Sequence, residues 1–136
     1  MTSSTRKRAA RALAVLATVL WSPLAMASDA DRIEAAAAKE MVEKGQALVI
    51  DVRAKDQYDA GHIEGSISVP LGEIDAHLAQ LPKDKMIVAY CTCGAEASSM
   101  GAVNKLKAAG YTKVAALKGG LAAWQGAGGK MSTPGH

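Results

Sequence analysis

The segment from residue 86 to residue 99, MIVAYCTCGAEASS, decides the fold. Its first five residues form a short apolar run, which suits a strand buried on both faces. The strand runs directly into Cys91, and a loop of small residues follows. We then expect a helix from Glu96 or Ser98 to Ala109. Because open α/β sheets bind ligands at the carboxyl ends of their strands, the segment predicts a functional site at Cys91.

On either side of this segment, apolar runs alternate with amphipathic stretches. We expect further strands at 47–50, 67–69 and 114–117, and further helices at 31–44, 71–81 and 121–125. Glycine and proline lie between these elements and favour turns. Strands that alternate with helices indicate an α/β fold, in which helices cover both faces of a mostly parallel sheet. There is no internal repeat, so we expect one domain.

The first 27 residues are typical of a secretory signal peptide. Four basic residues lie in the first eleven positions, at Arg6, Lys7, Arg8 and Arg11. An apolar stretch follows from Ala12, and Ala25 and Ala27 are the small residues that precede a cleavage site. The stretch is shorter than the roughly 20 residues that span a bilayer, so we expect no stable membrane anchor. We expect cleavage after Ala27 and a periplasmic or secreted protein.

The mature chain is expected to consist of a domain at 28–128 and a flexible tail at 129–136. The whole chain carries a formal charge of +3, and loss of the leader leaves 12 basic residues against 13 acidic ones. This balance lacks the basic footprint of a nucleic-acid-binding protein. We therefore expect no nucleic-acid binding, and we also expect the protein to be a monomer.

The chain has two cysteines, Cys91 and Cys93, separated by one residue. A bridge between them needs strained geometry and closes almost no loop, so a stabilising disulfide explains the pair poorly. Small residues followed by a helix start can surround a thiolate with backbone N–H groups. A thiol pKa about two units below the ordinary value of about 8.5 leaves the group mostly ionised at neutral pH. The alternative is a buried cysteine that acts as a small hydrophobic residue.

Four segments, in their order and spacing, resemble the signature segments of rhodanese domains. They are 49–53 (VIDVR), 58–66 (YDAGHIEGS), 88–91 (VAYC) and 117–124 (LKGGLAAW). The resemblance runs from about residue 33 to residue 128. It implies a rhodanese-like α/β fold, with a central parallel five-stranded sheet and helices on both faces. It also implies a sulfurtransferase that needs no metal and no organic cofactor.

The resemblance further implies that Cys91 is the nucleophile, which takes a sulfane sulfur from a small donor such as thiosulfate and passes it to a thiol or cyanide. The residues implied to surround the sulfur are Thr92, Cys93, Gly94, Ala95, Glu96, Ala97 and Ser98. The residues implied to be structural are Asp51, Arg53, His62, Gly119, Gly120 and Trp124. We expect Asp51 and Arg53 to pin loops by hydrogen bonds and His62 to lock a loop. The remaining three are expected in a turn and in the core.

The loop departs from the usual family pattern in its charge. It has no cation between Thr92 and Ser99, where the family commonly carries an Arg, a Lys or a Ser. We therefore expect weak activity toward thiosulfate. Glu96 stands in the loop instead, and a carboxylate close to the thiolate would raise the pKa of the thiol and repel a dianion. We expect Glu96 to point outward, as an acidic residue in the first turn of the helix.

The identity of the nucleophile stays open between the two cysteines. The strand end at Cys91 favours that residue. The distance to Gly110 has the family's common length when it is counted from Cys93, and it is two residues longer from Cys91. Both side chains would lie on the same face if the strand continued, because strand side chains alternate with a period of two.

There are three alternatives to a sulfurtransferase. Phosphatases of the same fold bind phosphate through an Arg six residues after the nucleophile, but Ala97 or Ser99 stands there in this chain. A sulfur-carrying or binding module without turnover is the second, and it would retain sulfur. A redox protein that uses Cys91 and Cys93 as an exchanging pair is the third, although a Cys-x-x-Cys spacing favours that chemistry more.

Overall fold

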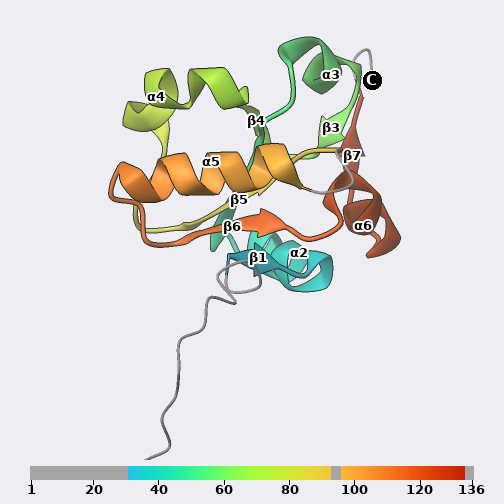
Figure 1. The fold of residues 1–136 in the computed structure, drawn as a ribbon. Coiled ribbons are helices and arrows are strands. Elements are labelled where there is room, and N and C mark those ends of the chain that lie inside the picture. The colour runs from blue at the N-terminus through green and yellow to red at the C-terminus, as the bar shows by residue number, and fades with distance from the viewer. Residues whose placement is uncertain (1–30, 93–95, 134–136) are drawn as a thin grey trace, which may run out of the picture.

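Five parallel strands form the central sheet, in the order β1-β6-β5-β2-β4. They are β1 (Arg32–Ile33), β2 (Ala47–Asp51), β4 (Ile67–Ser68), β5 (Met86–Tyr90) and β6 (Val114–Leu117). The structure is a computed structural model that describes residues 31–92 and 96–133. β5 is the middle strand and pairs with β2 from Met86 to Tyr90. The parallel five-stranded sheet expected from the sequence is confirmed, and its strands all end at one edge (Figure 1).

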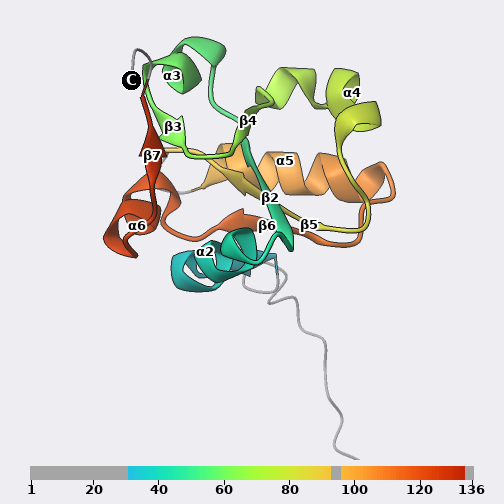
Figure 2. The same cartoon turned by 180° about the vertical axis from the view of Figure 1, so that it is seen from behind.

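Helices cover both faces of this sheet (Figures 1 and 2). On one face lie α4 (Ile74–His77) and α5 (Ala97–Ala108), and on the other lie α2 (Ala35–Glu43) and α6 (Gly120–Gly126). Another helix, α3 (Lys55–Ala60), follows β2 at the carboxyl edge of the sheet. The single helix expected at 71–81 is instead broken into η1 (Leu71–Glu73), α4 and η2 (Leu78–Gln80). Gly72 in its first turn weakens the helix there, because glycine has the most backbone freedom to lose.

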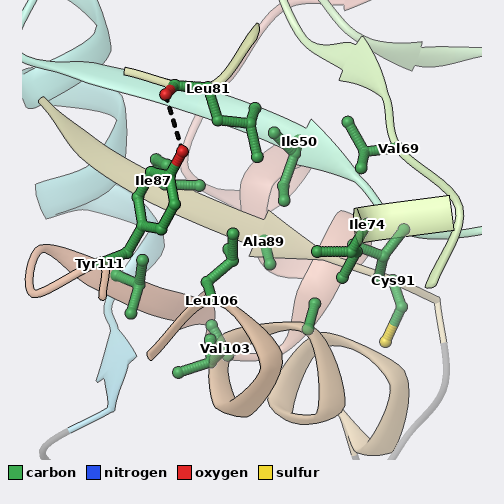
Figure 3. Packing of buried hydrophobic residues seen from close by; sticks show 14 residues of the cluster. Ile50, Val69, Ile74, Leu81, Ile87, Ala89, Cys91, Val103, Leu106 and Tyr111 are labelled. Carbon is green, nitrogen blue, oxygen red and sulfur yellow. Dashed lines mark hydrogen bonds between the residues drawn. The ribbon is translucent and has the colours of Figure 1, made fainter. Parts of the chain in front are cut away.

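The alternation of side chains along β2 and β5 divides the core into two layers. One layer packs against α4 and α5 and includes Ile50, Ile87, Ala89, Val103 and Leu106 (Figure 3). The other packs against α2 and α6 and includes Val49, Val88, Tyr90, Leu117 and Trp124. Burial of each large apolar side chain contributes about 1.5–3 kcal/mol, so these layers hold β5 and the residue that follows it in a fixed position.

The beginning of the domain differs from the sequence-based expectation. Arg32 and Ile33 do not belong to a helix but form the edge strand β1, in which Ile33 pairs with Leu117 of β6. The helix begins only at Ala35. Nothing local distinguishes the two outcomes, since both residues tolerate a helix. The pairing with β6 is a tertiary effect that outweighs local propensity.

The end of the domain also differs from the expected tail at 129–136. Met131–Ser132 form β7, which pairs antiparallel with β3 (His62–Ile63), and Glu64 N–H donates a hydrogen bond to the Lys130 carbonyl. Residues 129–133 are therefore tied to the fold, while 134–136 lie outside the described residues. The predicted signal peptide also lies outside them. In the part of the chain that the structure describes, no helix has the length and apolar composition to cross a membrane.

Candidate active site

Cys91 lies immediately after the central strand, at the carboxyl edge of the sheet. Its side chain is only 3% exposed, and its Sγ lies 3.8 Å from Ser99 Oγ of α5. Figure 3 shows this side chain beside Ile74, at the end of the layer that α5 covers. Cys91 is disulfide-bonded in the structure, so this is an oxidised state of the residue. Nucleophilic chemistry at Cys91 thus requires both reduction and access to a buried sulfur.

The loop that follows Cys91 is described only at its two ends. Thr92 is exposed, and Cys93, Gly94 and Ala95 lie outside the described residues. The expected cradle of backbone N–H groups around the sulfur therefore stays a prediction. The structure describes the chain again from Glu96 onward. The helix α5 begins at Ala97, which is exposed, and Ser98 is half-buried. The first turn of α5 directs its N-terminal dipole toward this end of the sheet, which favours a nearby anion.

Ser99 is a residue of this site that the sequence analysis did not identify. It is fully buried, and its hydroxyl donates a hydrogen bond of 2.9 Å to the Glu96 carbonyl. The same oxygen atom lies against the Cys91 sulfur. A signal was present in the sequence, because Ser99 shares the inward helical spacing of Val103 and Leu106. Ser99 thus links the start of α5 to the cysteine.

Glu96 does not point outward, and that expectation was wrong. The residue is 8% exposed, and its Oε1 accepts a hydrogen bond of 2.7 Å from the Gly119 N–H. Its Oε2 forms an ion pair of 2.6 Å with Nε of Arg32. The backbone of Glu96 is left-handed, with φ 54°, so the residue precedes the helix rather than forming part of its first turn. The carboxylate therefore reaches across to β1 and to the turn before α6.

That turn, from Gly119 to Leu121, also contacts Cys91 directly. The Leu121 N–H donates a hydrogen bond of 3.3 Å to the Cys91 carbonyl. Gly120 has a positive φ of 59°, and a Cβ built there would overlap the same carbonyl oxygen. Glycine is required at this position for both reasons. Gly119 and Gly120 were expected to lie in a turn, and the close contact with the Cys91 carbonyl explains why this turn contains glycine.

Asp51 and Arg53 form a buried network with Tyr90. The Arg53 guanidinium donates to both Asp51 oxygens at 2.6–3.0 Å and to the Gly61 carbonyl at 2.7 Å. The Tyr90 hydroxyl donates to Asp51 Oδ2 at 2.6 Å and accepts from the Ile63 N–H at 3.1 Å. The hydrogen bonds that Arg53 donates to Asp51 raise the pKa of Arg53. Burial, together with Asp51, raises the pKa of Tyr90 to about 12. The network ties the end of β2 to the segment 61–63.

The other residues expected to be structural lie in the same part of the molecule. The His62 ring stacks on Tyr58 with centroids 3.7 Å apart, and His62 Nδ1 lies 2.8 Å from the Tyr58 carbonyl oxygen. Trp124 is 3% exposed, and its Nε1 donates to the Lys130 carbonyl. These contacts join α3, β3, α6 and β7 around the carboxyl edge. Neither side chain contacts a reactive group among the described residues.

A groove of about 390 Å³ lies beside this edge, and its lining includes Arg53, Gln57, Leu121 and Gln125. Leu121 connects the groove to Cys91, because its N–H binds the Cys91 carbonyl. Within residues 31–92 and 96–133, no group of three or more His, Cys, Asp and Glu side chains is placed to hold a metal ion.

Comparisons with known proteins are consistent with this architecture. The family model for the rhodanese-like domain matches residues 34–127. The chain is 36% identical to the HTH-type transcriptional regulator Rv0324 of Mycobacterium tuberculosis, over 76% of this chain but only 45% of the regulator. It is 30% identical to a protein named sulfurtransferase from Allochromatium vinosum, over 63% of this chain and 78% of that protein. The crystal structure of the Alr3790 protein from Anabaena has a TM-score of 0.65 and 34% identity, and the match covers 73% of this chain and 89% of that one.

Proposed function

Because the chain belongs to the rhodanese-like domain family, we propose that it is a sulfurtransferase that carries a sulfane sulfur on Cys91. One observation carries the proposal: Cys91 follows the central strand of a family sheet and lies against the first turn of α5, where an anionic sulfur is favoured. The Allochromatium vinosum relative named as a sulfurtransferase supports the same activity.

The reaction begins with the reduced Cys91 thiolate. The thiolate attacks the outer sulfur of the donor, the bond between the two donor atoms breaks, and the leaving group departs with the electron pair. With thiosulfate, the leaving group is sulfite and the product is a Cys91 persulfide anion. A thiolate or cyanide acceptor then attacks the outer sulfur of the persulfide, which restores the Cys91 thiolate and gives a new persulfide or thiocyanate. The covalent intermediate predicts ping-pong kinetics.

We propose that thiosulfate is a poor donor for this protein. Arg53 lines the groove beside the site, but its guanidinium is bound to Asp51 and to the Gly61 carbonyl. Glu96, the acidic residue nearest to Cys91 in the sequence, is instead held by Arg32. A dianion therefore finds no uncommitted guanidinium among the described residues that line the groove. A donor of lower charge suits this environment better.

The burial of Cys91 favours a second candidate, a sulfur carrier with little turnover. Because Cys91 is 3% exposed, donors and acceptors have little access to its sulfur, so loading and release would both be slow. A carrier would accept one sulfur atom and keep it in the presence of acceptors. A sulfurtransferase would lose that sulfur to cyanide or a thiol and accept another.

Intact-mass measurement of the reduced protein tests the proposal. After incubation with thiosulfate or a small persulfide, and removal of the excess donor, the protein should gain one sulfur atom. Addition of cyanide should then remove that sulfur and release thiocyanate. Cys91→Ser is the matched control, because serine is close to cysteine in size and forms no persulfide. If no donor adds sulfur to the reduced wild-type protein, the proposed function is wrong.

We also propose that the protein is exported and cleaved after Ala27, as its basic and apolar N-terminus indicates. The mass of the exported protein should correspond to a chain that begins at Ser28. Retention of residues 1–27 in a membrane fraction would contradict this. We expect the exported protein to be monomeric, which size-exclusion chromatography with light scattering measures directly.

A further inference from the structure

Ser99 places a hydroxyl group beside the sulfur of Cys91. Its Oγ lies 3.8 Å from the Cys91 sulfur, and Ser99 itself is 0% exposed. Figure 3 shows that the Cys91 side chain points from the end of β5 toward α5, the helix to which Ser99 belongs. A buried hydroxyl so close to a reacting sulfur can interact with each state through which the sulfur passes.

In the oxidised structure this hydroxyl donates its hydrogen bond elsewhere. Because Cys91 is disulfide-bonded, its sulfur carries neither a proton nor a negative charge. The Ser99 hydroxyl donates a hydrogen bond of 2.9 Å to the carbonyl of Glu96, three residues earlier. Serine side chains in helices can bind a preceding carbonyl in this way. The observed hydrogen bond is therefore the one expected while the Cys91 sulfur is uncharged.

The Glu96 carbonyl does not depend on Ser99 for a hydrogen bond. It also accepts a hydrogen bond of 2.9 Å from the Met100 N–H. A serine hydroxyl rotates about its C–O bond, so the Ser99 proton can turn from this carbonyl toward the Cys91 sulfur. The rotation leaves the carbonyl paired with the Met100 N–H, which avoids the cost of a buried carbonyl without a partner. Ser99 can thus exchange one acceptor for the other.

We propose that Ser99 is a further catalytic residue, whose hydroxyl turns from the Glu96 carbonyl to the Cys91 sulfur when that sulfur becomes a thiolate. Ionisation releases the thiol proton to the solvent and leaves a negative charge on the sulfur. Hydrogen bonds to charged groups are stronger than those between neutral groups, so ionisation changes the preferred acceptor. The hydroxyl then stabilises the thiolate that attacks the sulfur donor. This catalytic role rests on the proposed sulfurtransferase function, whereas the hydrogen bond to the thiolate does not.

The ionisation of Cys91 can be measured without any sulfur transfer. The full chain with Cys93→Ser, kept reduced by a phosphine, has a single thiol, and the ultraviolet absorbance of its thiolate is recorded against pH. The same chain with Cys91→Ser added is the blank, which removes the signal of the tyrosines. Ser99→Ala deletes the hydroxyl, and Ser99→Thr retains one. The matched control is Ser66→Ala, which removes the hydroxyl of another buried serine, next to β4 and two strands away from β5.

Other ionisable side chains lie on the elements packed around Cys91. They include Arg32, Asp51, Arg53, Asp75, His77 and Glu96. All of them are the same in the parent and in every variant, so their charges affect all the ionisation curves alike. A shift confined to Ser99→Ala therefore reports the hydroxyl.

Ser99→Ala should move the midpoint of the thiolate curve upward by about 0.5–1 pH unit. Ser99→Thr should keep the midpoint of the parent, because threonine in a helix offers a hydroxyl at the same position, and Ser66→Ala should keep it as well. Alkylation by iodoacetamide is the second measurement. Below the midpoint, Ser99→Ala should react about three- to tenfold more slowly than the parent. Well above the midpoint it should react at least as fast, because the more basic thiolate is the better nucleophile. Circular dichroism verifies that each variant is folded.

A midpoint that Ser99→Ala leaves unchanged would overturn the proposal. An alkylation rate that falls by one constant factor at every pH would also overturn it, because a purely structural role changes access to the sulfur and not its ionisation. If the protein transfers sulfur, kcat/KM of Ser99→Ala should fall below the midpoint and approach the value of the parent above it. Failure of the sulfurtransferase function is a separate result, since it would abolish sulfur loading in every variant and leave the shift of the ionisation curve intact.

Discussion

Replacement of Tyr90 by Phe tests the buried network that joins β2, β3 and β5. The ring stays in the core next to Val88 and Trp124, but the hydroxyl is lost. That hydroxyl donates to Asp51 and accepts from the N–H of Ile63, and all three residues are 0% exposed. An unpaired buried N–H costs about 1–3 kcal/mol, and loss of one donor to a carboxylate adds a cost of about 1 kcal/mol. We therefore expect Tyr90→Phe to lower the free energy of unfolding by about 2–4 kcal/mol.

The same substitution changes how stability depends on pH. Because the pKa of Tyr90 is raised to about 12 in the fold, the folded state keeps this proton after the unfolded chain has lost it at about pH 10. The stabilising contribution is complete below pH 10 and is lost as the pH rises to 12. One pKa unit corresponds to about 1.36 kcal/mol, so the loss approaches about 2–3 kcal/mol. Tyr90→Phe lacks this loss, and the difference between the two proteins should shrink above pH 10.

Urea unfolding at pH 7 and at several values up to pH 11.5, followed by circular dichroism, measures both effects. The matched control is Tyr58→Phe, which removes a hydroxyl that donates to the Ser66 carbonyl from a half-buried ring. Water can replace that hydroxyl, so its loss should cost only about 0.5–1.5 kcal/mol. The reasoning fails if the free energies of unfolding of Tyr90→Phe and the wild-type protein differ by less than about 0.5 kcal/mol at pH 7. It also fails if the difference between these two free energies does not become smaller at alkaline pH.

Three further predictions test the site. Gly120→Ala should lower the free energy of unfolding, measured with urea, by about 2–4 kcal/mol, because the new Cβ meets the Cys91 carbonyl oxygen. The control is Gly45→Ala, which has a similar φ and open space around the new Cβ and should lower the same free energy by only about 1 kcal/mol. Ala97→Arg should lower the KM for thiosulfate in a sulfite-release assay, and an equal effect of Ala108→Arg at the far end of α5 would contradict a local cause. Cys91→Ser should abolish persulfide formation, and Cys93→Ser should preserve it and lengthen its lifetime. The reverse result in mass spectra would assign the nucleophile to Cys93.

The fold was predictable where each segment specifies its own environment. The apolar runs 47–50, 86–90 and 114–117 are long enough to require burial on both faces, and they became β2, β5 and β6. The sequence did not reveal β1 and β7, which have two residues each. Such short strands have no periodicity of their own, and each exists because a partner strand offers unpaired backbone groups. Their positions follow from tertiary pairing, which local propensity does not encode.

The site was predictable in its location and not in its charge arrangement. The end of a buried strand placed Cys91 at the carboxyl edge, because this rule depends only on the order of elements. The partner of Glu96 depends on a contact between residues 32 and 96, which come together only because β1 lies beside β6 and the turn after β6 lies beside Cys91. An acidic residue at the start of a helix is ordinarily stabilised by the helix dipole, and this interaction contributes about 0.3–1 kcal/mol. The half-buried Arg32 guanidinium and the Gly119 N–H give the carboxylate two direct partners, so it turns inward. Glu96 and its partner Arg32 therefore lie far apart in the sequence, and no motif around the cysteine includes both.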